Sequence, residues 1–153
     1  IGPEAEVAPV QPEDVIEEAS ARFPGGPETI IDPLPEVMAD RELLSTAVNE
    51  VLDNAVRYRD ENRPPLVRVS GTIEGSLAVI RLADNGFGIK PDRVDRAFEL
   101  FRQVHRVGDT PASGMGLPIA RRSVESQRGS MTLCPGPYGG TIAEIRLPTS
   151  SGA

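Results

Sequence analysis

The chain has 153 residues, the size of one ordinary domain, and it is long enough to bury a core without disulfides or metal ions. Its composition, 39% hydrophobic and 25% charged, excludes a disordered or membrane-embedded chain. The net charge of −7 argues against a nucleic-acid-binding surface, which needs clustered Lys and Arg. Cys134 is the single cysteine and no apolar run approaches the roughly 20 residues of a membrane span, so we expect a cytoplasmic domain without disulfides or membrane contact.

The first forty or so residues predict one helix and one short strand. Residues 1–11 are acidic and rich in proline, and their apolar residues follow neither a helical nor a strand period. They are therefore predicted to be a linker. From 12 to 23 the apolar residues recur at helical spacing, which predicts a helix. A short β-type run at 29–31 is closed by two prolines, and Asp40 is then a candidate N-cap for the next helix.

The middle of the chain predicts an amphipathic helix and a hairpin. Apolar residues at intervals of 3, 4 and 7 over 41–58 indicate a helix with one buried face. Two β-type runs follow at 66–73 and 77–83, and Gly75 between them can supply a positive φ. The hairpin makes antiparallel pairing the expected arrangement of neighbouring strands.

Downstream, the pattern predicts helices over 91–104 and 115–127. The chain then ends in two β-type runs, 130–134 and 141–147. Helices and strands mix without strict βαβ alternation. We therefore expect an α+β fold, a two-layer α/β sandwich.

The helix over 41–58 carries a polar stripe beside its apolar face. At about 100° per residue, Glu50, Asn54 and Arg57 fall on one side of the helix, at the edge of the buried stripe. These residues are either solvated surface groups or the wall of a pocket. A carboxylate, an amide oxygen and a cation on successive turns suit a site that holds Mg²⁺ and a phosphate.

Two glycine-containing segments favour the pocket. In "DNGFGI" the chain turns directly after a strand, where glycines let the backbone approach a ligand closely. In "SGMGLPIA" two glycines lead into a helix whose first N–H groups are unpaired, an arrangement that can bind an anion. Neither segment matches a P-loop or a dinucleotide-binding fingerprint.

Four segments in this order, "NEVLDNAVRY", "DNGFGI", "AFELFRQV" and "SGMGLPIA", resemble a known set. They look like the N, G1, F and G2 boxes of the catalytic ATP-binding domain of sensor histidine kinases, in the GHKL ATPase superfamily. The resemblance implies a catalytic domain over 12–148 and a tail over 149–153, with a mixed, mostly antiparallel sheet backed by three helices and an ATP lid. "LFRQVHR" further resembles the lid segment of phytochrome-like kinases.

The resemblance implies ATP and Mg²⁺ as cofactors. It assigns Mg²⁺ coordination to Asn54 and acceptance of the adenine N6 amine to Asp84. By the same resemblance, the base is lined by Tyr58, Gly86, Gly88, Ile89 and Thr141. The phosphates and the lid involve Arg57, Phe98, Phe101, Gly114, Met115, Gly116 and Leu117.

The chain departs from the family pattern at three places. Ala112 stands where the G2 box usually opens with another glycine, and "QRGS" stands where the last helix often ends in His-Gly-Gly. Glu50 occupies a position that is often asparagine in histidine kinases but is the water-activating glutamate in the gyrase and chaperone branches. We expect Glu50 to have an auxiliary catalytic role. It would act either as a base toward the attacking imidazole or as a residue that contacts the ligands of the metal.

The resemblance implies that the γ-phosphoryl group of ATP passes to a histidine on a separate dimerisation and phosphoacceptor domain, and indirectly to a response regulator. The only histidine here, His105, falls in the expected lid and is interpreted as a surface residue. Besides this interpretation, two alternative functions stay open, which makes three hypotheses in all. Glu50 favours an ATP-hydrolysing domain of the gyrase or mismatch-repair type, and the third reading is a nucleotide-binding regulatory module of anti-sigma type.

Overall fold

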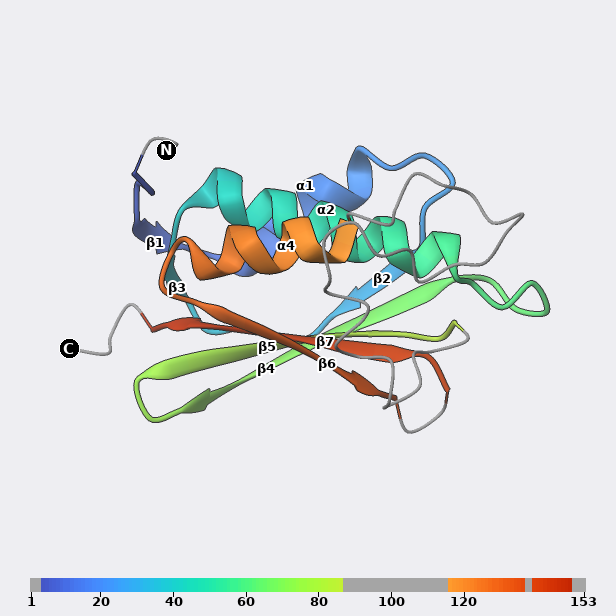
Figure 1. Cartoon of the computed structure of the whole chain (residues 1–153). Coiled ribbons are helices and arrows are strands. Elements are labelled where there is room, and N and C mark those ends of the chain that lie inside the picture. The colour runs from blue at the N-terminus through green and yellow to red at the C-terminus, as the bar shows by residue number, and fades with distance from the viewer. Residues whose placement is uncertain (1–3, 87–115, 137–138, 150–153) are drawn as a thin grey trace.

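The computed structural model describes residues 4–86, 116–136 and 139–149. Three helices, α1 (Pro12–Ala21), α2 (Arg41–Arg57) and α4 (Gly116–Glu125), lie on one face of a five-stranded sheet (Figure 1). This arrangement confirms the predicted two-layer α+β sandwich. None of the described helices combines the length and the apolarity needed to span a membrane.

The large sheet is mixed, with the order β2-β4-β5-β7-β6. Its strands are β2 (Glu28–Ile31), β4 (Leu66–Glu74), β5 (Leu77–Asp84), β6 (Ser130–Pro135) and β7 (Thr141–Pro148). Only the β2–β4 pair is parallel among these neighbours, and the others are antiparallel as expected. Gly75 has φ 65° in the β4–β5 turn, so the predicted hairpin and its turn glycine are confirmed.

A second, two-stranded ribbon joins β1 (Ala8–Val10) to β3 (Val37–Ala39). Both strands escaped prediction, and β1 falls within the segment expected to be a linker. Three-residue strands are too short to show a period of two, and here the pairing partner lies about thirty residues along the chain. The ribbon packs the start of the domain against its interior, because Val37 and Ala39 are fully buried.

The core lies between the helices and the inner face of the sheet. Alternate residues of each long strand point inward, such as Val67 and Val69 of β4 and Ile80 and Leu82 of β5. The apolar stripe of α2 meets them from above. The buried residues of α2 are Leu44, Ala47, Val48, Val51, Leu52 and Ala55. Apolar residues that repeat every 3.6 positions in α2 thus pack on apolar residues that repeat every second position in the strands.

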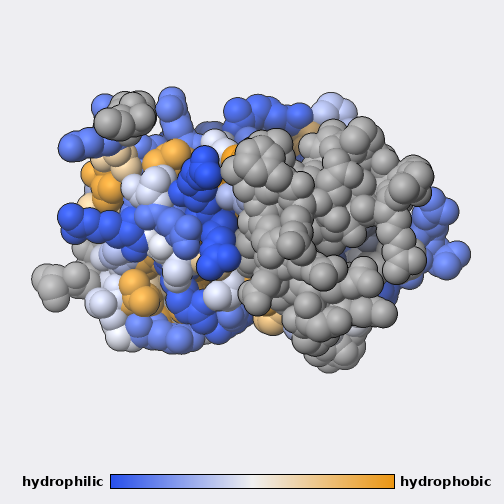
Figure 2. Space-filling view, viewed as in Figure 1, coloured by the Kyte–Doolittle hydropathy of each residue, from blue (hydrophilic) through white to orange (hydrophobic). Residues whose placement is uncertain are grey.

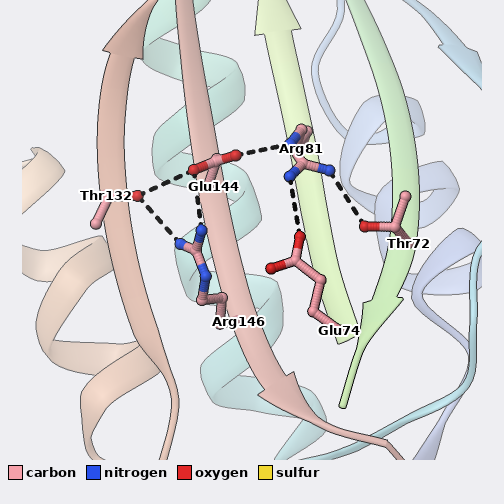
Figure 3. A network of polar contacts seen from close by, with 6 residues as sticks. All are labelled: Thr72, Glu74, Arg81, Thr132, Glu144 and Arg146. Carbon is pink, nitrogen blue, oxygen red and sulfur yellow. Dashed lines mark hydrogen bonds and ion pairs between the residues drawn. The ribbon is translucent and has the colours of Figure 1, made fainter. Parts of the chain in front are cut away.

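The outer face of the sheet carries a network of charged side chains instead (Figure 3). Arg81 on β5 donates from Nε to Glu144 Oε2 on β7 at 2.6 Å, and Arg146 donates from Nη2 to Glu144 Oε1 at 3.2 Å. Glu74 and Thr72 on β4 complete the contacts of Arg81. The Arg81 contacts cross between strands and the Arg146–Glu144 pair lies within β7, and such partly exposed pairs stabilise a sheet modestly.

Polar side chains join the start of α2 to the end of α4. Asp40 accepts from Leu43 N at 3.1 Å, which confirms the predicted N-cap, and it accepts from Glu6 N at 2.7 Å. Gln127, 2% exposed, accepts from Asp40 N at 2.7 Å and donates to Ser123 O at 3.1 Å. One buried amide therefore joins the end of α4 to the start of α2.

Arg128 follows with φ 66°, and Gly129 N donates to Val124 O at 3.0 Å. This is a left-handed helix C-terminus, where glycine is the usual residue. The departure "QRGS" therefore places Arg128 at a backbone position that glycine would fit with less strain.

Candidate functional site

The C-terminal half of α2, the end of β5 and the start of β7 lie at one end of the molecule, beside the N-terminus of α4 (Figure 1). The predicted site residues that the structure describes come from these elements or directly follow them in the chain. The described part of the surface in the same view is mostly hydrophilic, with small scattered apolar patches (Figure 2).

Asp84, the last residue of β5, is held by two backbone donors. Its Oδ1 accepts from Gly86 N at 3.0 Å and from Thr141 N at 3.1 Å. Its Oδ2 has no hydrogen-bond partner within the described ranges. Burial raises the pKa of the carboxyl, and the two N–H groups partly offset that rise. The result is a fixed, half-buried carboxylate with one oxygen available to a donor from outside the chain.

Two glycines allow the backbone to close around Asp84. A Cβ at Gly86 would collide with the carbonyl oxygen of Tyr58. A Cβ at Gly140 would collide with the carbonyl oxygen of Asp84 and would lie 2.9 Å from its Oδ1. Gly140 also has φ 78°, which disfavours any L side chain. Gly86 and Thr141 were predicted, whereas Gly140 was missed although the "GG" before the last strand signals a special backbone.

Asn85 is a second residue that sequence reasoning missed. Its Oδ1 accepts from Leu66 N and its Nδ2 donates to Pro64 O, both at 2.9 Å. The side chain thereby ties the α2–β4 loop to the turn after β5. It fixes the loop on one side of Asp84, which a D-N-G turn signal alone could not reveal.

The polar stripe of α2 is present at the predicted edge of the buried face. The side chain of Asn54 is half-buried, and none of its polar atoms forms a hydrogen bond within the described part of the chain. An amide oxygen without a protein partner fits the hard, oxygen-preferring Mg²⁺ ion. Tyr58 closes the helix, with its N–H donating to Asn54 O at 3.1 Å.

Arg57 lies one turn after Asp53 and pairs with it, Nη2 to Oδ2, at 3.1 Å. Its Nε is buried without a hydrogen-bond partner. Glu50 is half-buried on the same stripe. Burial raises the pKa of Glu50, the nearby Asp53 carboxylate adds to the rise, and the Arg57 guanidinium opposes it. The stripe thus combines an amide without a protein partner, an ion-paired cation whose Nε–H lacks an acceptor, and a carboxyl that binds its proton more tightly than usual.

Glu50 also lines a groove of about 320 Å³ between the end of α1 and α2. Arg22 and Phe23 form the α1 side of this groove, and Asn49 and Asp53 share the α2 side with Glu50. Glu50 is therefore accessible from the helix surface. The Glu50 side chain therefore belongs both to the polar stripe and to the wall of this groove.

Gly116 begins α4, as the glycine pattern predicted, and Leu117, 7% exposed, belongs to the hydrophobic core. The remaining predicted site residues lie outside the described residues. They are Gly88, Ile89, Phe98, Phe101, Gly114 and Met115, and the same holds for His105, Ala112 and the helix predicted over 91–104. Within the described ranges, no group of three or more His, Cys, Asp or Glu side chains could hold a metal ion.

Residues 39–151 match the family of histidine kinase-, DNA gyrase B- and HSP90-like ATPases. The chain belongs to this family. It is 33% identical over 115 residues to the methanogenesis regulatory histidine kinase FilI of Methanothrix harundinacea, covering 75% of this chain and 13% of that protein. It is 27% identical over 123 residues to the phytochrome-like protein Cph1 of Synechocystis, covering 80% of this chain and 16% of that protein.

Among solved structures, full-length ShkA in complex with AMPPNP is similar, with a TM-score of 0.76 and 27% identity. The match covers 97% of this chain and 32% of ShkA. The chain thus spans only a small part of the length of these curated relatives. The predicted family and fold are confirmed by these matches.

Proposed function

We propose that this domain binds ATP, with adenine read by Asp84. The observation that carries the proposal is the geometry of its carboxyl: Oδ1 is held by Gly86 N and Thr141 N, and Oδ2 has no partner within the described residues. A fixed carboxylate oxygen suits the N6 amine of adenine, which donates hydrogen bonds, and would repel the O6 of guanine. AMPPNP is an analogue of ATP, so the complex of similar ShkA supports the same ligand class.

The phosphates would extend along the α2 stripe from this base site. Arg57 offers the buried Nε–H to a phosphate oxygen, and Asn54 offers its amide oxygen to Mg²⁺. When bound, Mg²⁺ neutralises charge on the phosphate oxygens. The N-terminus of α4 begins at Gly116, and its N–H groups are further donors to an anion.

The whole protein would use this site to pass the γ-phosphoryl group to a histidine. FilI is named a histidine kinase, and this chain is similar to it. The phosphoacceptor would lie on a separate helical dimerisation domain, with a response regulator receiving the phosphoryl group next. Phosphoryl transfer depends mainly on positioning and charge neutralisation, which Asn54 and Arg57 are placed to provide. Because ATP is a cytoplasmic metabolite, we propose the cytoplasm as the compartment.

Glu50 would have an auxiliary part in the transfer. Its raised pKa and its place in the wall of the groove between α1 and α2 suit a group that an acceptor side chain could reach from outside. A base near the attacking imidazole must accept a proton at the pH of the reaction, which a raised pKa favours.

The test combines binding and transfer. Calorimetric titration with AMPPNP and Mg²⁺ should show binding to the unmodified chain and about 100-fold weaker binding to Asp84→Ala, because a hydrogen bond to a charged group is lost. Glu74→Gln on the outer sheet face is the matched control and should bind normally. Incubation with γ-labelled ATP and a helical dimerisation domain should then give acid-labile phosphohistidine. Absence of binding in every variant would contradict the proposal.

A further inference from the structure

Arg57 holds a buried donor that the protein does not satisfy. Of the buried side-chain nitrogens and oxygens in the described ranges, Arg57 Nε is the one that lacks a hydrogen-bond partner. Leaving a buried donor unpaired costs about 1–3 kcal/mol, and more when the group is charged. Such a group in a native structure calls for an explanation, and a ligand that supplies the acceptor is one.

Asp53 determines how this donor is presented. Arg57 Nη2 donates to Asp53 Oδ2 at 3.1 Å across one turn of α2, and the two side chains are 19% and 34% exposed. In a guanidinium, Nε–H and one Nη2–H share the edge that binds a carboxylate or phosphate with two parallel bonds. Asp53 contacts only Nη2, so the buried Nε–H on the same edge has no acceptor among the described residues. The ion pair therefore orients the group and leaves Nε–H for a second anion.

The position of the Asp53–Arg57 pair on α2 indicates which anion would accept from Nε–H. Asp53 and Arg57 flank Asn54 on α2, the helix that runs toward the Asp84 end of the molecule. We propose that Asp53 is a positioning residue, which holds Arg57 so that Nε–H meets an oxygen of the nucleotide's phosphate chain. This inference rests on the proposed function, because it needs a nucleotide whose base lies at Asp84.

Charge alone predicts the opposite effect for Asp53. A carboxylate near a polyphosphate repels it, so removing the carboxylate should strengthen ATP binding if charge is all that matters. Removing it should weaken ATP binding if Asp53 orients Arg57. The sign of the change therefore separates positioning from simple electrostatics.

The experiment measures the dissociation constants of Mg-ATP and of adenosine for the unmodified chain and for Asp53→Asn. We expect ATP to bind about fivefold more weakly to the variant, with adenosine unchanged. Glu18→Gln is the matched control, because Glu18 pairs with Arg41 at 2.7 Å on exposed helix surfaces. It should change neither constant. A general loss of structure would weaken both ligands together and lower the melting temperature.

A double-mutant cycle with Arg57→Lys completes the test, since lysine keeps the charge but lacks Nε–H and the planar fork. In that background Asp53→Asn should change ATP affinity by less than about twofold. Stronger or unchanged ATP binding to Asp53→Asn, or equal weakening of ATP and adenosine, would overturn this inference alone. An unmodified chain that binds neither ligand would overturn the proposed function and this inference with it.

Discussion

The two ends of the α2–α4 helix pair differ in how their polar groups are satisfied. At one end, Asp40 and Gln127 bond to backbone groups of both helices and of the N-terminal segment. At the other end, Asp84 Oδ2 and Arg57 Nε have no protein partner in the described residues. The polar groups at the closed end are satisfied within the protein, whereas the open end keeps one acceptor and one donor that the proposed nucleotide would use.

The contrast predicts which property each substitution changes. Substitutions at the closed end should change the free energy of unfolding and leave nucleotide affinity intact. Substitutions at the open end should change affinity, unless they also disturb the backbone around Asp84.

The largest effect should come from Gly140→Ala, which alters both properties. The new Cβ would collide with the Asp84 carbonyl oxygen and would force φ 78° on an alanine. We expect a loss of about 3 kcal/mol in the free energy of unfolding, from strain and overpacking together, and loss of ATP binding. Gly75→Ala is the matched control, because Gly75 has φ 65° but open space around it. It should cost about 1 kcal/mol, measured by urea denaturation. Equal losses of unfolding free energy in the two variants would show that the backbone shifts to avoid the contact with the Asp84 carbonyl oxygen, and would contradict the prediction.

Gln127→Met at the closed end should cost about 2 kcal/mol, because Asp40 N–H would lose its acceptor in a buried place. Methionine has a similar length, so the core should stay filled. Chemical denaturation measures the cost, and calorimetry of the folded protein should find ATP affinity unchanged. A large drop in ATP affinity would mean that the two ends are coupled, and it would contradict the claim that the closed end affects stability alone.

Arg128→Gly should stabilise the protein by about 0.5–1 kcal/mol. Arg128 adopts φ 66° at the end of α4, where glycine avoids the steric cost. A shift of the urea midpoint to higher concentration, at constant slope, would confirm it. Loss of stability would show that the Arg128 side chain contributes more than its backbone costs.

The smallest effect concerns pH, because burial and the two N–H bonds act on Asp84 in opposite directions. Its folded pKa is raised, so the folded state binds the proton more tightly than the unfolded state. Stability from this group is therefore full below the unfolded pKa and is lost as pH rises through the folded pKa. Unfolding of Asp84→Asn, compared with the unmodified chain, should show a larger advantage for the variant at pH 7 than at pH 4. An advantage that grows toward low pH would contradict the assignment.

Periodicity and turn chemistry predicted α2, the β4–β5 hairpin, and Asp40 as an N-cap, because each signal is contained within a few turns or strands of local sequence. The positions of Gly140 and Asn85 could not be predicted this way. Gly140 matters through Asp84, which lies more than fifty residues earlier in the chain, and Asn85 matters through the backbone of Pro64 and Leu66. Motif resemblance predicted roles for Asp84 and Asn54, but only the folded chain shows which of their atoms already have a hydrogen-bond partner.

The most direct test of the account is the choice between ATP and ITP, which carries an oxygen where adenine carries its N6 amine. Asp84 Oδ2 can accept from the amine and should repel the oxygen, so we predict that the unmodified chain binds ATP at least about 100-fold more tightly than ITP. In Asp84→Asn the amide can donate to the oxygen, and the preference should shrink or reverse. Equal affinities of the unmodified chain for both nucleotides would contradict the assignment of Asp84 as the group that reads the base.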